Sequence, residues 1–365
     1  MASSFFRFLF SDMKFLFVAP RFHTNQYGAV NSLLRHGHDV KFLASSQSRT
    51  ECHNRITPVL LPGNISRNVR EYRNILEHYA PDVIIIRGID LQNIVFASLG
   101  RRSTKNIILY TQDPLYRRKE RAARIIIHKR LFNLISRVRI TPVLGSITAQ
   151  TFSLPHEYFV PFVMEPHRQV EDREYFRDGK VNILSIGKFF LERKNHLLLL
   201  DAIDELRRIH PVRLTLIGSL NDEKNPYYMK IRNHIAQRGL ENTVTLNINV
   251  PHRVCLDQYI LHDLFILPST NEPAAISPLE AMAHGLPAIC SDTNGTKDYI
   301  HIGENGFIFR SNDIDDLKTK IEWIVSDRKL LVQMGKESLR LVEHWYSPDR
   351  FHSELCRIIQ NEFSQ

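Results

Sequence analysis

The chain has 365 residues, a length typical of about two domains of ordinary size. Hydrophobic residues make up 43% and charged residues 24% of the sequence, a globular balance that argues against a disordered chain. The four cysteines are far apart and form no C-x-x-C pair, so they indicate neither a disulfide framework nor a thiolate zinc site. This cysteine usage fits a reducing cytosol, and no apolar run approaches the ~20 residues that span a bilayer.

The formal net charge of +9 is concentrated in one segment. Between Arg117 and Arg139, nine lysines and arginines stand against one glutamate, a local balance of +8. The segment is predicted to be a helix whose inward face carries apolar residues at helical spacing: Ile127, Leu131, Leu134 and Val138. Its basic face is either an ordinary solvated surface or a site for an anionic membrane or a nucleic acid.

Short apolar runs alternate with helical patterns in the first half of the chain. Helices are expected at 26–35, around 66–79 and in the basic segment. Strands are expected at 14–19, 39–44, 83–87 and 106–111, with weaker ones near 139–143 and 157–161. Continuous apolar strands between helices predict a buried parallel sheet.

The same alternation restarts after the polar segment 164–180, which is interpreted as a linker. Strands are expected at 181–187, 212–218, 243–248, 264–267 and 287–291. Helices are expected at 195–209, 226–238, 313–326, 328–344 and 347–362. The fold class is therefore α/β, with two doubly wound domains whose ligand sites lie outside the carboxyl ends of their strands.

The stretch NEPAAISPLEAMAHGLPAICSD places two glutamates on either side of a helix start. Ser277 suits the N-cap and Pro278 the first helical position, so Glu280, three residues after the cap, can close a capping box. A ligand-binding role for Glu280 stays open beside this structural one. Glu272 lies in the preceding loop, close to a helix N-terminus that attracts anions.

A second loop, from Gly187 to Asn195, follows a strand and carries Lys188 and Lys194, whose point charges suit phosphate oxygens. A third loop follows Gly218. Together, the stretches SIGKFFLERKNHLLLLDAI, LTLIG, LPSTNEPAAISPLEAMAHGLPAICSD and GENGFIF resemble the C-terminal domain of retaining GT-B glycosyltransferases with the E-x7-E motif (group 1, family 4 type). MKFLFVAPRF and HGHDVKFLA resemble the first two strands of that family more weakly.

The resemblance implies a GT-B fold with two facing Rossmann-like domains and a C-terminal helix that crosses back to the first. The implied boundaries are 1–165 for an acceptor-binding domain, 166–180 for the linker, 181–346 for a nucleotide-sugar domain and 347–365 for the returning helix.

The resemblance also assigns roles at the donor site. Lys188 and Lys194 would bind the donor diphosphate, with Lys188 standing where arginine is more usual. Glu272 would contact hydroxyls of the donor sugar, and Glu280 the nucleotide ribose. The remaining donor-binding residues would be Gly187, Gly218, Ala275, Ile276 and Ser277.

The acceptor side departs further from the family, which often has a histidine after the strand that is here 106–111. This chain has Gln112 and Asp113 there, either of which could stand in by hydrogen bonding to the sugar, although neither is an imidazole that titrates near neutral pH. His23 and Gly28, in and after the loop that follows the first strand, are the other acceptor-side candidates. The absence of G-x-G-x-x-G disfavours a dinucleotide-dependent oxidoreductase.

The resemblance implies transfer of a hexose from a UDP- or GDP-linked sugar to a glycan or lipid-linked acceptor, with retention and without metal or cofactor. We expect a role in cell-surface polysaccharide or glycoconjugate synthesis, in the cytoplasm or at the inner face of the cell membrane. The alternatives are a nucleotide-sugar epimerase or a sugar phosphorylase of the same fold, and a basic nucleic-acid-binding protein. The last leaves the two glutamates unexplained.

Overall fold

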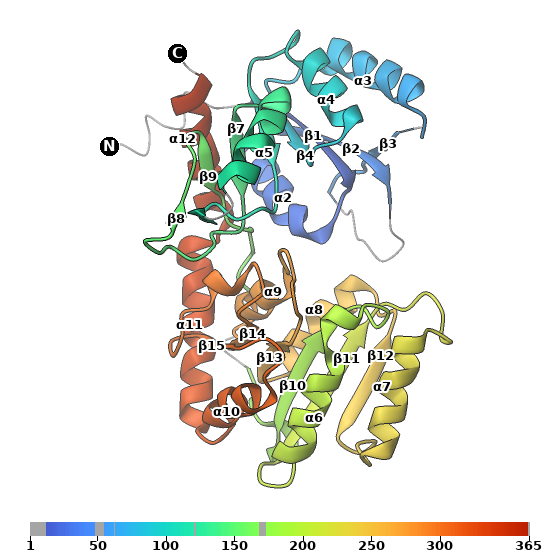
Figure 1. Cartoon of the computed structure of the whole chain (residues 1–365), viewed down its shortest axis with the longest axis vertical. Coiled ribbons are helices and arrows are strands. Elements are labelled where there is room, and N and C mark those ends of the chain that lie inside the picture. The colour runs from blue at the N-terminus through green and yellow to red at the C-terminus, as the bar shows by residue number, and fades with distance from the viewer. Residues whose placement is uncertain (1–11, 48–54, 62, 120–121, 168–172, 364–365) are drawn as a thin grey trace. The chain divides into compact units, whose positions relative to one another are not determined.

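The computed structural model describes residues 12–47, 55–61, 63–119, 122–167 and 173–363. The chain divides into two compact units (Figure 1). Unit 1 comprises 1–163 together with 346–365, and unit 2 comprises 164–345. Among the residues described, no helix is long and apolar enough to cross a bilayer.

Unit 1 is built on a seven-stranded parallel sheet in the order β3-β2-β1-β4-β5-β7-β9. Its strands are β1 (Lys14–Arg21), β2 (Asp39–Ser46), β3 (Val59–Leu60), β4 (Val83–Arg87), β5 (Ile107–Tyr110), β7 (Val138–Thr141) and β9 (Glu157–Phe159). The central strand β1 is buried on both faces, which explains its unbroken apolar run. Phe15 and Phe17 face one hydrophobic core, and Leu16 and Val18 the other.

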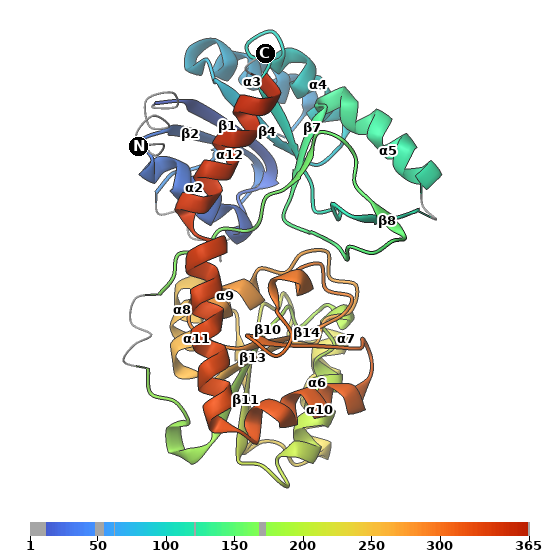
Figure 2. The same ribbon diagram turned by 90° about the vertical axis from the view of Figure 1, so that its left-hand side faces the viewer.

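Helices cover both faces of this sheet. The first core receives α2 (Tyr27–Arg35) and α12 (Pro348–Phe363), and the second receives α3 (Ile65–Tyr79), α4 (Leu91–Gly100) and α5 (Ala122–Ile135). The C-terminal helix α12 lies beside α2 (Figure 2), and the Ser32 hydroxyl donates to the Pro348 carbonyl at 2.6 Å. The expected return of the C-terminal helix to the first unit is therefore observed.

Unit 2 is built on a six-stranded parallel sheet in the order β12-β11-β10-β13-β14-β15. Its strands are β10 (Val181–Ile186), β11 (Val212–Gly218), β12 (Val244–Ile248), β13 (Leu264–Leu267), β14 (Ala288–Ser291) and β15 (Gly306–Phe309). Its helices are α6 (His196–Leu206), α7 (Pro226–Gln237), α8 (His252–Leu261), α9 (Ser277–Ala283), α10 (Ile314–Val325) and α11 (Arg328–Trp345). The two α/β sheets confirm the expected fold class.

The described part of the polar segment 164–180 belongs to unit 2 and packs against the rest of that unit. The Arg173 guanidinium is buried and donates to the carbonyls of His284 at 2.5 Å and Tyr259 at 2.8 Å. The Phe176 N–H donates to the Asp263 carboxylate at 3.0 Å. Hydrogen bonds from this polar segment therefore hold it to the rest of the second unit.

The basic segment 117–139 is not the single helix that its spacing predicted. It contains the short strand β6 (Arg117–Arg118), helix α5 and the start of β7. The predicted inward face is wrong for three of its four residues, because Ile127, Leu131 and Leu134 are 62%, 43% and 46% exposed. The fourth, Val138, is buried, but it lies in β7 and not in a helix. Helix α5 instead buries the neighbouring stripe that contains Phe132 and Ile135. Two stripes of apolar residues that are offset by one position have the same helical period. The spacing alone therefore did not decide which of the two faces the core.

Several elements gave no clear sequence signal. These are β3, β6, β8 (Thr151–Phe152), α4, α8 and β15. Most of these strands have two to four residues, below the length at which apolar alternation becomes readable. Among them, helix α8 supplies two hydrogen-bond partners of Glu280.

Candidate active site

Glu272 forms the centre of a charged cluster at the carboxyl ends of β10 and β13. It lies in the loop after β13, and its Oε2 accepts a hydrogen bond from Lys194 Nζ at 2.6 Å. Arg193 Nη1 donates to the same oxygen. The side chain of Glu272 is only 9% exposed and that of Lys194 is 12% exposed. The fold therefore brings together two residues that the sequence assigned to separate loops, and adds Arg193, which it did not single out.

The two lysines of the loop after β10 occupy different environments. Burial lowers the pKa of Lys194, and the Glu272 carboxylate counteracts part of that shift. Lys188 is exposed, and its ammonium lies 5.5 Å from the centre of the Phe190 ring. Lys194 is therefore held in place by the Glu272 carboxylate, whereas Lys188 reaches solvent.

Two glycines allow the loop after β10 to lie against the end of β11. A Cβ at Gly218 would stand 2.2 Å from the Gly187 carbonyl oxygen and 2.8 Å from the Phe189 ring. A Cβ at Gly187 would stand 3.3 Å from the Lys194 side chain and from the His196 ring. Close packing therefore favours glycine at both positions, and more strictly at Gly218 than at Gly187.

The residue that begins α6 gives the lysine loop a rigid base. The His196 N–H donates to the Tyr227 hydroxyl at 2.9 Å, and the ring packs against Phe189 and Tyr227. The His196 side chain is 1% exposed, and burial lowers its pKa to about 3. The imidazole therefore stays neutral beneath Lys194 at physiological pH.

The capping box expected at the start of α9 is wrong. Ile276 occupies the N-cap position, and the Ser277 side chain makes no cap bond there. The Glu280 carboxylate points instead to α8, where it accepts from His252 Nε2 at 3.0 Å and from the Tyr259 hydroxyl at 2.9 Å. Because a carboxylate only accepts, His252 carries its proton on Nε2.

Glu280 is buried but remains ionised. Burial alone would raise its pKa, but the hydrogen bonds and the charge of His252, together with the Tyr259 hydroxyl, hold the pKa below its ordinary value. On the expected donor-binding stretch, Ala275 is buried like Glu280, whereas Ile276 and Ser277 are half-buried.

The backbone of the first glutamate is also fixed. Glu272 forms a parallel bridge with Asn294, and the Gly295 N–H donates to the Glu272 carbonyl at 2.8 Å. The Asn294 Oδ1 accepts from the N–H and the hydroxyl of Thr296 at 3.1 and 3.0 Å. The turn after β14 therefore holds the loop after β13, so that Glu272 has a defined position.

In unit 1, two acceptor-side candidates have structural roles. His23 precedes a 3-10 turn (Thr24–Gln26), and its Nδ1 accepts from the Asn25 N–H at 3.3 Å. A Cβ at Gly28 would stand 2.0 Å from the Val163 carbonyl oxygen, so a close approach of backbones requires glycine there.

The other two candidates, Gln112 and Asp113, lie in the loop after β5, where Gln112 is half-buried and Asp113 is exposed. The Asp113 carbonyl accepts from Arg139 Nη1 at 3.0 Å and from the Thr141 hydroxyl at 2.7 Å. Arg139 therefore fixes the backbone of this loop from the neighbouring strand β7.

Arg139 is itself almost completely buried, with 1% exposure. Its Nη2 donates to Glu157 at 2.8 Å, and Arg117 donates to the same carboxylate at 2.6 Å. Burial lowers the pKa of Arg139, and the Glu157 carboxylate opposes that shift. Two of the nine basic residues in the segment are thus paired internally and do not contribute to a basic surface.

A polar group that the sequence did not indicate lies at the end of β4. Arg87 Nη1 donates to Asn25 Oδ1 at 3.3 Å and to Gln26 Oε1 at 3.5 Å, and the guanidinium lies over the Tyr110 ring at 5.6 Å. Asn25, Gln26 and Tyr110 also line a small cavity of about 30 Å³. Arg87 ends a run of apolar residues, so its pattern signalled only a strand.

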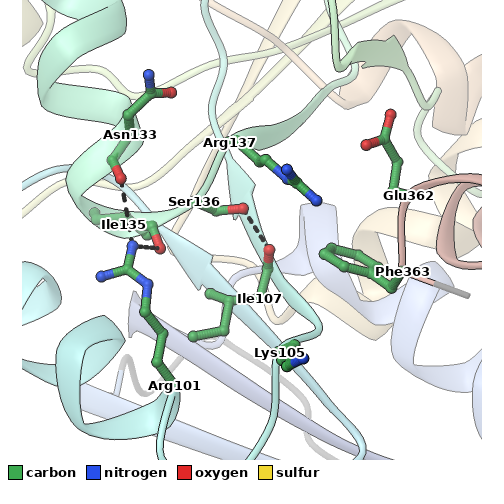
Figure 3. A pocket seen from close by; sticks show the side chains of 9 residues that line it. All are labelled: Arg101, Lys105, Ile107, Asn133, Ile135, Ser136, Arg137, Glu362 and Phe363. Carbon is green, nitrogen blue, oxygen red and sulfur yellow. Dashed lines mark hydrogen bonds between the residues drawn. The ribbon is translucent and has the colours of Figure 1, made fainter. Parts of the chain in front are cut away.

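A larger pocket of unit 1, of about 440 Å³, lies at the opposite ends of β5 and β7 (Figure 3). Arg101 on its wall donates to the carbonyls of Leu134 and Ile135 at 2.8 Å each, which caps the end of α5. The described lining includes Lys105, Arg137 and Glu362 but none of the four acceptor-side candidates. This pocket is therefore separate from the loops that the sequence analysis identified.

Comparison with known proteins finds a family match within unit 2. Residues 168–340 match the family described as Glycosyl transferases group 1. An uncharacterized glycosyltransferase of Haemophilus influenzae is 27% identical over 175 residues, which are 47% of this chain and 47% of that protein. A GDP-mannose-dependent phosphatidylinositol monomannoside mannosyltransferase of Mycolicibacterium smegmatis is 22% identical over 50% of this chain and 48% of its own. The matched segments span about half or less of the curated relatives.

Solved structures match over both units. A glycosyltransferase of Rickettsia africae has a TM-score of 0.70 at 13% identity, over 96% of this chain and 99% of its own. HepE of Anabaena, crystallised with UDP-glucose, has a TM-score of 0.70 at 13% identity, over 96% of this chain and 100% of its own. At these identities the likeness shows the fold, which is the two-domain, Rossmann-like fold of the GT-B class.

Proposed function

We propose that this chain, whose residues 168–340 match the glycosyl transferases group 1 family, moves a hexose from a UDP- or GDP-linked sugar to a glycan or lipid-linked acceptor with retention of configuration. The observation that carries the proposal is the cluster of Glu272, Lys194 and Arg193 at the carboxyl ends of the unit 2 strands. Ligands of such sheets bind at that edge. HepE, whose crystal structures contain UDP or UDP-glucose, has the same fold, which supports a nucleotide sugar as donor.

The proposed chemistry depends on an exchange of partners. Departure of the nucleoside diphosphate builds negative charge, which Lys194 and Lys188 would stabilise without a metal ion. In the free protein Lys194 pairs with Glu272. A diphosphate would draw Lys194 toward its oxygens, and the Glu272 carboxylate would then accept hydrogen bonds from hydroxyls of the donor sugar.

Glu280 would bind the ribose of the nucleotide. Its carboxylate accepts one hydrogen bond on each oxygen, from His252 and Tyr259, and each oxygen has a further lone pair. Its lowered pKa keeps it ionised and therefore an acceptor for a ribose hydroxyl. The contacts to α8 hold the side chain in one orientation before the nucleotide arrives.

Calorimetric titration with UDP, GDP, ADP and CMP in the presence of EDTA tests the donor site. We expect one nucleoside diphosphate to bind selectively, and Lys194→Ala to weaken that binding. Lys230→Ala is a matched control, because Lys230 is an exposed lysine of the same unit and pairs with the exposed Glu192. Failure of all four nucleotides to bind, or equal losses in both variants, would contradict the assignment of this site.

Transfer to an acceptor is a separate part of the proposal. A nucleotide-sugar epimerase would convert or release the sugar without any acceptor, and a phosphorylase would require inorganic phosphate. Incubation of the preferred nucleotide sugar with the protein, with and without glycan or lipid-linked acceptors, separates these outcomes. Release that is independent of acceptor would overturn the transferase proposal.

We also propose that α5 contacts an anionic membrane surface that holds a lipid-linked acceptor, consistent with a role in cell-surface polysaccharide synthesis. The exposed apolar side chains of Ile127, Leu131 and Leu134 recur along one face of α5, and Lys129 and Arg130 lie beside them. Apolar side chains that insert between head groups, flanked by basic ones, are typical of interfacial helices.

Sedimentation with vesicles of mixed anionic and neutral lipids tests the membrane contact. We expect the protein to pellet at low salt, and a Leu131→Gln, Leu134→Gln double variant to pellet less. If the protein remains in the supernatant but shifts a nucleic-acid duplex in a salt-dependent way, the basic segment binds nucleic acid instead.

A further inference from the structure

Two histidines and a cysteine converge in unit 1 at a place that sugar transfer does not use. His38 Nε2 lies 2.8 Å from His352 Nε2, and Cys356 Sγ lies 3.5 Å from the same nitrogen. The three ligand atoms are all within 4.8 Å of one another, and we call this group the His–His–Cys cluster. His38 is 4% and Cys356 2% exposed, so the cluster is largely shielded from water.

The fold positions these side chains from opposite ends of the sequence. His38 immediately precedes β2, which begins at Asp39, whereas His352 and Cys356 lie four residues apart on one face of α12. The bond from Ser32 to the Pro348 carbonyl fixes the first turn of α12, and Leu355 is buried in the same core as Phe15. The hydrogen bond from Ser32 and the packing of Leu355 therefore hold α12 where the three ligand atoms lie close together.

The neighbouring groups keep the rings oriented. The His36 ring stacks on the His352 ring with centroids 3.9 Å apart and planes 3° apart. Its Nδ1 lies 2.8 Å from the Ser32 carbonyl, and its Nε2 lies 3.3 Å from the Asp349 carboxylate. Because both nitrogens of His36 have other partners, His36 acts as a support for His352 and is not itself counted among the ligands.

The facing nitrogens are chemically suited to a soft or borderline cation. Two imidazole nitrogens and a thiol sulfur that face one another are a ligand set that such cations prefer, and a bound cation would hold the thiol as a thiolate.

We propose that His38 Nε2, His352 Nε2 and Cys356 Sγ bind one Zn²⁺-class transition-metal ion that fastens α12 to the start of β2. Imidazole and thiolate ligands favour zinc, cobalt or copper over magnesium or calcium. Three protein ligands leave the fourth tetrahedral position to water. On binding, the proton shared between the two Nε2 atoms moves to Nδ1 of its ring, and the thiol proton is released to solvent.

Cobalt titration of the complete chain tests the site. The protein, with any affinity tag removed and stripped by a chelator, is titrated with Co²⁺ and then with Zn²⁺. We expect one equivalent of Co²⁺ to give a thiolate-to-cobalt charge-transfer band, and Zn²⁺ to displace it. We expect Cys356→Ser to abolish the band and His352→Gln to weaken Co²⁺ binding at least ~10-fold. Cys255→Ser is the matched control, a buried cysteine of the other unit whose loss should leave the band unchanged.

Thermal unfolding gives a second readout. A bound ion should raise the Tm of the wild-type chain in proportion to its occupancy, and should not raise that of His352→Gln. The proposal is overturned if no stoichiometric charge-transfer band forms, or if the band persists in Cys356→Ser. If Cys356→Ser does not fold, an unchanged Co²⁺ affinity of His352→Gln overturns it equally.

Discussion

Replacement of Glu272 by glutamine tests whether Lys194 exchanges partners when a nucleotide binds. The substitution keeps the shape of the side chain but removes the charge that faces Lys194 and Arg193. In the free protein, the pair between Glu272 and Lys194 competes with any phosphate for the same ammonium. We therefore expect Glu272→Gln to bind the preferred nucleoside diphosphate more tightly and yet to transfer sugar more slowly.

The size of the effect follows from the geometry of the pair. Lys194 Nζ and Glu272 Oε2 are 2.6 Å apart, with side chains 12% and 9% exposed. A hydrogen bond to a charged group contributes about 1.5–3 kcal/mol, whereas an exposed ion pair contributes about 0.2–1 kcal/mol. When the wild-type protein binds a diphosphate, the partial loss of this pair costs about 1–2 kcal/mol of binding free energy. The variant does not have this cost, so its diphosphate affinity should be roughly 5- to 30-fold higher. The free variant should be less stable by a similar amount.

Three measurements separate these effects: calorimetry with the diphosphate alone, urea unfolding of the free protein, and initial rates of transfer. Glu192→Gln is the control, since Glu192 is an exposed glutamate of the loop that carries Lys194, and it pairs with Lys230. We expect the control to leave all three quantities near those of the wild type. A folded Glu272→Gln protein with unchanged or weaker diphosphate affinity would refute the exchange of partners.

Three further outcomes are expected. In Glu280→Gln, an amide replaces the carboxylate that accepts from His252 and Tyr259. This change should lower the unfolding free energy by about 1–3 kcal/mol and weaken nucleotide binding. Wild-type stability of the variant in urea would show that the two donors rearrange. Arg139→Met removes one partner of a buried ion pair and should lower the free energy of unfolding in urea by about 3–5 kcal/mol. The control Arg118→Met, at an exposed arginine, should lower it by at most ~0.5 kcal/mol. Equal losses in the two variants would contradict the buried ion pair. Burial lowers the pKa of His262 to about 4, so on acidification the unfolded chain binds a proton at this residue before the folded protein does. The unfolding free energy should therefore fall as the pH drops from 6.5 to 4, by about 2 kcal/mol at pH 5. His262→Asn should flatten this pH dependence, and an unchanged dependence would contradict the burial of a neutral ring.

Much of unit 2 was predictable because the residues of its central strands are mostly buried: β13 is buried at every residue, and β11 is interrupted only by the exposed Arg213 and the half-buried Thr215. Strands β11 and β13 begin and end at the predicted residues, and β10 differs at one residue. A strand covered on both sides must be apolar throughout, so the pattern marks both its presence and its limits. Once the strands are placed, parallel order brings the loops with Lys194 and Glu272 to the same edge of the sheet. Their proximity was therefore implied by the fold class, although their direct ion pair was not.

The details that escaped prediction depend on long-range partners. The interpretation of Ser277 and Glu280 as a capping box used only local rules, and it failed because α8 offers Glu280 two buried donors. The buried stripe of α5 was misassigned because two adjacent stripes were both apolar. Arg139 was counted as a surface charge, but Glu157 gives it a partner inside unit 1. In each case the competing contact comes from a segment whose position the local pattern does not contain.

The arrangement around Glu272 explains why carboxylate and cations occur together at a site proposed for an anion. A buried lysine without a counter-ion is unfavourable, because burial already lowers the pKa of Lys194. Glu272 satisfies that charge in the free protein, at the cost of repelling the diphosphate. The donor sugar removes this conflict if its hydroxyls engage Glu272 while its phosphates engage Lys194. In the proposed reaction, a complete nucleotide sugar would satisfy both charges, whereas a bare diphosphate would leave Glu272 with Arg193 as its remaining partner, and this difference would favour the donor over the product.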